Sequence, residues 1–88
     1  MTCRVDRLLI ENGLAVLRVS GRIAGDNVDV LRAAINQERG SLAIDLEEVN
    51  LVDSGAVNLL AVSEANGVEL RNCPGYIREW VDQERARW

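Results

Sequence analysis

The fold of this chain is decided by residues 44–57, Ile44-Asp45-Leu46-Glu47-Glu48-Val49-Asn50-Leu51-Val52-Asp53-Ser54-Gly55-Ala56-Val57. Leu42, Ile44 and Leu46 alternate with smaller or polar residues, which predicts a short strand over 42–46 followed by a loop over 47–52. Asp53 or Ser54 then caps a helix whose end is marked by Gly67. The stretch therefore predicts a strand, a loop and a helix start, an order typical of α/β domains. The expected inner face of this helix is formed by Val57, Leu60, Ala61 and Ala65.

Upstream of this stretch, Asn12-Gly13 predicts a two-residue type I′ turn between strands over 5–11 and 14–20. Counting outward from the turn sets Ile10 opposite Ala15 and Leu8 opposite Leu17 on the core face. Leu9 opposite Val16 and Arg7 opposite Arg18 then lie on the outer face.

A first helix is predicted after this hairpin, with Asp26 or Asn27 as its cap and Gly40 as its end signal. A further short strand follows at 68–71. A third helix starts near Pro74 and carries Ile77, Trp80, Val81 and Glu84 on one side. The order ββαβαβα predicts an α/β sandwich with a mixed four-stranded sheet whose helices pack mainly on one face. We expect one domain over residues 1–88, with its core at about 5–81 and a C-terminal tail at 82–88.

Composition limits the kinds of partner and chemistry. The 88 residues carry 14 acidic and 10 basic side chains, all of the basic ones Arg, for a net charge of −4. The basic residues are not clustered, which argues against nucleic acid as a partner. The chain has no apolar run of membrane-span length and no signal-peptide pattern, so we expect a cytoplasmic protein without direct membrane insertion. Cys3 and Cys73 are expected to be small buried or half-buried side chains.

Catalytic chemistry is disfavoured because the chain has neither His nor Lys. A minor alternative is an enzyme that uses Asp45, Glu47 and Asp53 as general acids and bases or as metal ligands. Three acids near a short loop are more often solvated side chains and a helix cap. We therefore expect no catalytic residues, no metal and no cofactor.

The residues described so far resemble the STAS domain family, the fold of bacterial anti-sigma factor antagonists and of the cytoplasmic tails of sulfate transporters. The resemblance rests on the order of elements and on two segments and covers about residues 5–81. The segments are Val19-Ser20-Gly21-Arg22-Ile23 and the motif Ile44-Asp45-Leu46-x-x-Val49-x-x-Val52-Asp53-Ser54-Gly55.

The resemblance implies a non-catalytic protein–protein interaction module with a regulatory or signalling role. In typical members, the helix start docks on an ATP-binding anti-sigma kinase, and phosphorylation of the second Ser in Asp-Ser-Ser-Gly-Leu breaks the complex. That position is Gly55 here, so the resemblance implies binding without the usual switch. Ser54 is a weak candidate phosphoacceptor, and a helix-capping role explains it better. The family's acidic residue in the first loop is replaced by Ala24, with Asp26 two positions later.

We predict partner contacts at Asp53, Ser54, Gly55, Asn58 and Val62, with Ala24 and Asp26 as a loop contribution. The alternative partner is a membrane transporter of ABC or anion type, which the chain would serve as a cytoplasmic accessory subunit. A fifth strand of the family is missing, which leaves a sheet edge to be covered. Leu9, Leu14 and Val16, together with Trp88, predict a small apolar patch whose candidate use is a homodimer.

Overall fold

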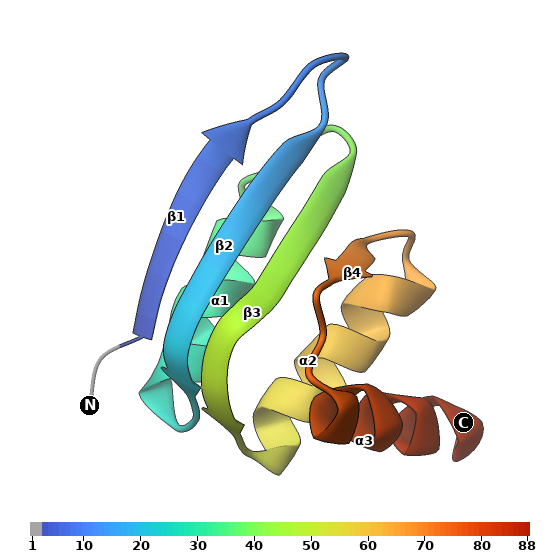
Figure 1. Ribbon diagram of the computed structural model, residues 1–88. Helices are drawn as coiled ribbons and strands as arrows, with labels where there is room; N and C mark the ends of the chain where they lie inside the picture. Colours follow the sequence, from blue (N-terminus) through green and yellow to red (C-terminus); the bar gives the residue numbers. More distant parts are fainter. Residues whose placement is uncertain (1–2) are drawn as a thin grey trace.

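The computed structural model describes residues 3–88. Its elements follow the predicted order ββαβαβα, and the sheet has the spatial order β1-β2-β3-β4. β1 and β2 are antiparallel, whereas β2–β3 and β3–β4 are parallel (Figure 1), so the predicted mixed sheet is confirmed. The elements are β1 (Cys3–Leu9), β2 (Ala15–Ile23), α1 (Asp26–Asn36), β3 (Leu42–Val52), α2 (Ser54–Ala65), β4 (Glu69–Arg71) and α3 (Gly75–Ala86).

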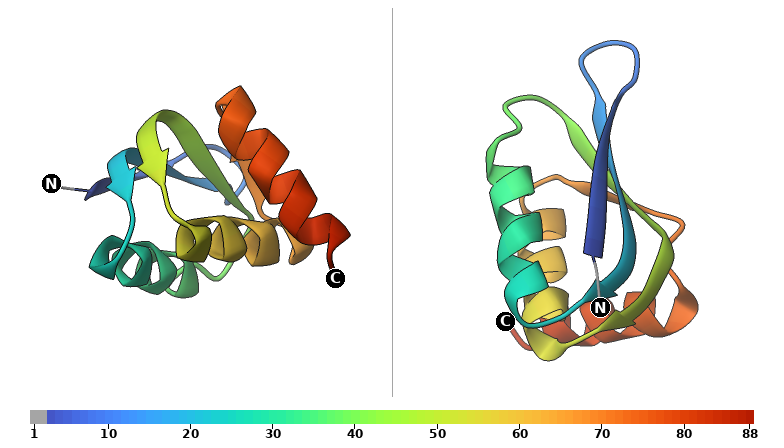
Figure 2. Two further views of the ribbon diagram at one scale, coloured as in Figure 1. Left: turned by 90° about the horizontal axis from the view of Figure 1, so that it is seen from below. Right: turned by 90° about the vertical axis from the view of Figure 1, so that its left-hand side faces the viewer.

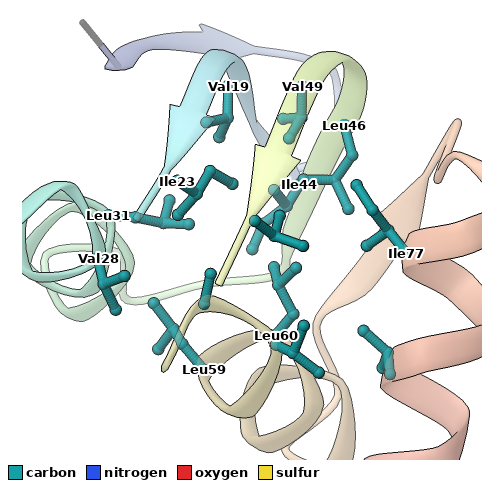
Figure 3. Close-up of a cluster of buried hydrophobic side chains, with 14 of the residues drawn as sticks. Val19, Ile23, Val28, Leu31, Ile44, Leu46, Val49, Leu59, Leu60 and Ile77 are labelled. Carbon is teal, nitrogen blue, oxygen red and sulfur yellow. The ribbon is translucent and has the colours of Figure 1, made fainter. Parts of the chain in front are cut away.

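The helices cover one face of the sheet. α1 and α2 lie side by side beneath it, and α3 flanks the β3 side and packs against α2 (Figure 2). The core lies between these layers, where Ile44 and Leu46 of β3 meet Leu60 of α2 and Ile77 of α3 (Figure 3). All four side chains are fully buried. Burial of such side chains supplies most of the favourable free energy of a domain of this size.

The hairpin turn has the predicted conformation but joins a different register. Asn12 and Gly13 have φ values of 67° and 78°, as a type I′ turn requires. The amide of Ile10 donates to the carbonyl of Leu14, however, so Glu11 is an additional residue on the first strand. The predicted pairing is wrong by one residue, and a shift of one exchanges the two faces of β1. The observed pairs are Leu9–Ala15, Leu8–Val16 and Arg7–Leu17.

This register also changes the predicted apolar patch. Val16 is buried, Leu14 is half-buried, and Leu9 lies on the face that carries the helices, where it is 70% exposed because no helix reaches it. Ile10 is exposed rather than part of the core. The exposed apolar side chains of the hairpin are therefore Leu8, Leu9 and Ile10.

β3 is longer than predicted, because the segment 47–52 is strand rather than loop. Two irregularities in its pairing with β2 each place one additional residue on β3. Such bulges break the alternation of inward and outward side chains. The buried residues of this half are Leu46, Val49 and Val52, three positions apart, so the sequence does not show a strand pattern there.

The helices differ from the predictions in three places, two at their ends and one on an inner face. Gly25, not Asp26 or Asn27, is the N-cap of α1, and Asn27 instead donates its side-chain amide to the carbonyl of Arg22. α1 ends at Asn36, four residues before the predicted stop at Gly40. Ala65 is exposed rather than on the inner side of α2.

α3 lies beside the part of β3 that β4 leaves unpaired (Figure 1). β4 pairs only with residues 43–45 of β3. Ile77 and Val81 of α3 are buried in the same core cluster as Leu46 and Val49 of β3. The helix continues to Ala86, so most of the segment 82–88 is helical. The only aromatic residues of the chain, Tyr76, Trp80 and Trp88, lie on or just after α3 and are exposed.

The two cysteines are free thiols and lie partly buried against the core, as predicted. Burial raises the pKa of both thiols above the ordinary value. Both are therefore weak nucleophiles at neutral pH.

Candidate functional site

The site lies where two helices begin next to each other. β2 ends at Ile23 and β3 ends at Val52, and because the two strands are parallel their carboxyl ends meet at the same edge of the sheet. α1 and α2 start within three residues of these ends. The amide of Asp53 donates to the carbonyl of Ile23 at 3.2 Å, which joins the two chain segments. The sheet therefore brings the first loop and the Asp-Ser-Gly segment together.

The Asp53 carboxylate connects the two helix starts. Its Oδ1 accepts a hydrogen bond from the Ala56 amide at 2.8 Å and caps α2, and its Oδ2 accepts one from the Gly25 amide at 2.9 Å. Of the two predicted caps, Asp53 is the one observed. The hydrogen bonds from Gly25 and then Ala56 lower the pKa of this carboxyl below its ordinary value. Sequence reasoning missed Gly25, whose φ of 57° marks its special conformation.

Ser54 is the first residue of α2 and is exposed. The predicted capping role of its hydroxyl is wrong, because the adjacent carboxylate fills that role. Gly55 follows on the same exposed turn. A Cβ built there would lie 3.4 Å from Oδ1 of Asp53 and 3.9 Å from Cγ2 of Val28, which are ordinary contacts. The position has room for a larger side chain, so packing does not explain why this chain has Gly where the family has Ser.

The other two predicted contact residues lie further along α2. Asn58 and Val62 are both exposed, and Asn58 donates its side-chain amide to Glu84 of α3 at 3.3 Å. Ser54, Gly55, Asn58 and Val62 thus form an exposed face of α2 bordered by α3, which we call the α2 surface.

α3 is held against α2 by an ionic cluster that sequence reasoning missed. Glu64 accepts two hydrogen bonds from the Arg78 guanidinium, both at 2.7 Å, and one from Arg85 at 2.9 Å. These bonds, led by that of Arg78, lower the pKa of Glu64. The partners are 14 and 21 residues apart, so no local pattern in the sequence shows the cluster.

The loop residues lie next to this site. Ala24 is half-buried, and its carbonyl accepts from the Asn27 amide at 3.1 Å. Asp26 is exposed in the first turn of α1. Gly25 lies between them and bonds to Asp53, so both residues border the start of α2.

The three carboxylates considered as an enzyme site are not brought together. Asp45 lies in the first half of β3, whereas Asp53 follows the end of that strand, roughly 25 Å away at the rise of an extended chain. Asp45 is 8% exposed and accepts hydrogen bonds from the amide of Glu47 and the side chain of Asn72. Within residues 3–88, no three His, Cys, Asp or Glu side chains are grouped closely enough to hold a metal ion.

Across the described range 3–88, no helix is both long enough and apolar enough to cross a membrane.

Comparison with known proteins finds similarity in structure but not in sequence families. No family model matches the chain, and no curated protein matches it. The anti-sigma factor antagonist SpoIIAA in its unphosphorylated form is similar over 86% of this chain and 79% of its own, with a TM-score of 0.66 and 18% identity. The antisigma-factor antagonist STAS domain from Rhodobacter sphaeroides is similar over 78% of this chain and 83% of its own, with a TM-score of 0.59 and 22% identity.

A third solved structure, described as Mglu, is similar over 82% of this chain with a TM-score of 0.61 and 21% identity. The match covers only 19% of that larger chain. At these identities the similarity establishes the arrangement of the backbone. The chain has the STAS-like fold of the anti-sigma factor antagonists.

Proposed function

We propose that this chain is a non-catalytic, regulatory protein-interaction module that binds a partner protein through the α2 surface. The observation that carries the proposal is the exposure of Ser54, Gly55, Asn58 and Val62 on one helix of a STAS-like fold. A surface of small and uncharged side chains suits a protein contact, because little charge loses its hydration on binding. The partner is another protein, of anti-sigma kinase type.

We further propose that binding proceeds without a serine phosphorylation switch. Gly55 occupies the position where the STAS resemblance expects the phosphorylated Ser. Asp53 already accepts the amides of Gly25 and Ala56, so these two donors are not free to receive a phosphate on Ser54. A phosphate there would also add negative charge beside an existing carboxylate.

Asn58→Arg tests the proposed surface. The new side chain lies near Glu84 and is tolerated by the fold, but it places a charge in the centre of the α2 surface. We expect recovery of the partner from native extract, measured by quantitative mass spectrometry, to fall at least about tenfold, a loss of roughly 1.4 kcal/mol of binding. Asn36→Arg, at the exposed end of α1, is the matched control and should recover the partner as the unmodified chain does. Equal recovery by both variants would show that the α2 surface is not the contact.

Ser54→Asp tests the absence of a switch. Because Ser54 is exposed and does not cap α2, a carboxylate there meets the favourable end of the helix dipole on one side and the Asp53 charge on the other. We expect the free energy of unfolding to change by less than about 0.5 kcal/mol, the usual range for an exposed site. Binding of the recovered partner should change by less than about threefold, because Ser54 lies at the end of the α2 surface next to the existing Asp53 carboxylate, whereas Asn58 lies at its centre. A large loss of binding with an intact fold would restore the switch.

A transporter is the second candidate partner, and Gly55 favours it because an accessory subunit needs no phosphoacceptor. The same capture experiment separates the two candidates. A partner recovered only from detergent-solubilised membranes, together with a permease or its ATPase, would assign the chain to a transporter. A partner recovered from the membrane-free extract would assign it to a regulatory complex.

A further inference from the structure

β1 is an edge strand with one side unpaired. Within residues 3–88 it pairs with β2 alone, and the right-hand view of Figure 2 shows its other edge in front of the molecule with no element across it. Exposed strand edges offer a row of backbone donors and acceptors to another strand. β1 is therefore one open boundary of the sheet; the opposite boundary is the three-residue strand β4.

The inner face of β1 is incompletely covered as well. A cavity of about 500 Å³ lies between β1 and α1, with Val5, Leu17, Val30 and Ala34 in its lining. Val30 of α1 is 51% exposed at this cavity. Arg7 and Glu38 also line it and join β1 to the end of α1 by an ion pair of 2.8 Å. α1 thus leaves apolar surface uncovered along the same strand whose edge is free.

We propose that a second copy of this chain pairs with β1, antiparallel, about a two-fold axis at Val5. In this register Arg4 of each copy lies opposite Asp6 of the other. The two side chains form an ion pair of 3.1 Å within one strand, and both are accessible at the edge, with 77% and 43% of their side-chain surface exposed. Opposite charges directly across two strands stabilise the pairing.

The charges of β1 select this register over its neighbours. In a continuous two-fold sheet, residues that face each other across the axis must have their side chains on the same side of the sheet. Because side chains alternate between the two sides, the pairing can shift only in steps of two residues, which moves the axis from one residue of β1 to the next. The adjacent registers set Arg4 opposite itself or Asp6 opposite itself, and the next sets Arg7 opposite itself. A further step sets Asp6 opposite Ile10. Among pairs formed within β1 (Cys3–Leu9), only the axis at Val5 opposes unlike charges, whereas an unrelated strand would meet Arg4, Asp6 and Arg7 without partners.

The same pairing would close the cavity. Three strand spacings of about 4.8 Å separate the two copies of β2, which is roughly 14 Å. α1 contacts both β1 and β2, so it is displaced toward the shared strands (Figure 2). The two α1 helices thereby approach the 8–10 Å at which helices pack, with the exposed Val30 and Ala33 between them. The dimer would be an eight-stranded sheet with β4 at each end, four helices beneath it and an α3 helix beside the β3–β4 side of each copy.

Charge exchange between two variants tests this arrangement. We expect size-exclusion chromatography with light scattering to give twice the 9.7 kDa mass for the unmodified chain. Arg4→Asp and Asp6→Arg should each raise the dissociation constant of the dimer at least about tenfold, because each places like charges across the axis. Mixed in equal amounts, the two variants should associate again, since the acidic strand of one now faces the basic strand of the other.

Renewed association in the mixture can come only from contacts between copies, because each variant still lacks the Arg4–Asp6 ion pair within its own strand. Arg87→Asp makes the same charge change at the C-cap of α3, a helix remote from β1 (Figure 1), and should leave the dimer intact. A monomeric unmodified chain would overturn the proposal. Dimers that resist both β1 substitutions, or variants that stay monomeric when mixed, would overturn it equally. Asn58→Arg tests the proposed partner contact and leaves β1 unchanged. A failure of the proposed function can therefore be distinguished from a failure of the proposed dimer.

Discussion

Replacing Ile77 with alanine is expected to lower the free energy of unfolding by about 3 kcal/mol, the usual cost of emptying a buried Ile site. Ile77 is 0% exposed and points from α3 toward Ile44 and Leu46 of β3 (Figure 3). Domains of this size are stable by only about 5–10 kcal/mol, so the loss is a large share of the total. Urea denaturation followed by far-ultraviolet circular dichroism measures it.

Tyr76→Ala is the matched control for this prediction. Tyr76 precedes Ile77 on the same helix but is 52% exposed, so its truncation should cost less than about 1 kcal/mol. The contrast tests whether α3 is an integral part of the core. Similar, small losses for both variants would mean that α3 is only loosely attached. In that case the hydrogen bond between Asn58 and Glu84 could not define the border of the α2 surface.

Asp53→Ala is expected to lower the free energy of unfolding by about 2 kcal/mol, because it removes a helix cap and a second hydrogen bond to a backbone amide. The two amides belong to Ala56 and Gly25, at the starts of α2 and α1. Asp53→Asn, which keeps one acceptor oxygen, should lose about half as much. Equal stability of the alanine variant and the unmodified chain would show that the carboxylate does not join the two helices.

The lowered pKa of Asp53 also predicts a pH dependence. A carboxyl whose pKa is lower in the folded state contributes stability above its unfolded pKa of about 3.9, and this contribution disappears as the pH falls through the folded value. The difference in unfolding free energy between the unmodified chain and Asp53→Asn should therefore be constant near pH 7. It should shrink as the pH is lowered below about 4, which isolates Asp53 from the other carboxyls. A difference independent of pH would assign the effect to shape alone.

The parts of the fold that were predictable from the sequence are those specified by neighbouring residues. The cap at Asp53 is three residues from the amide that it accepts, and Asn12-Gly13 adopts the turn that these residue types favour. The apolar alternation at 42–46 is local in the same way. The candidate site could be located for this reason, since its centre is a helix start with a strong cap signal.

The features that were not predictable depend on residues distant in the sequence. One additional residue at Glu11 shifts the hairpin register, and no local preference distinguishes it from the two-residue loop. The second half of β3 is a strand because it pairs with β2, and its bulges remove the alternating pattern. Gly25 is 28 residues from Asp53, and Glu64 is 14 from Arg78, so these contacts exist only once the sheet and helices are assembled.

The placement of the aromatic side chains determines what an optical experiment on this protein reports. Trp80 and Trp88 are the two indoles of the chain, and both are associated with α3, as is the single tyrosine. Intrinsic fluorescence therefore reports the surroundings of α3, while far-ultraviolet circular dichroism reports the backbone of every element. If α3 detaches before the sheet unfolds, the fluorescence transition will occur at lower urea concentration than the circular dichroism transition. Coincident transitions would instead identify the domain as one cooperative unit that includes its last helix.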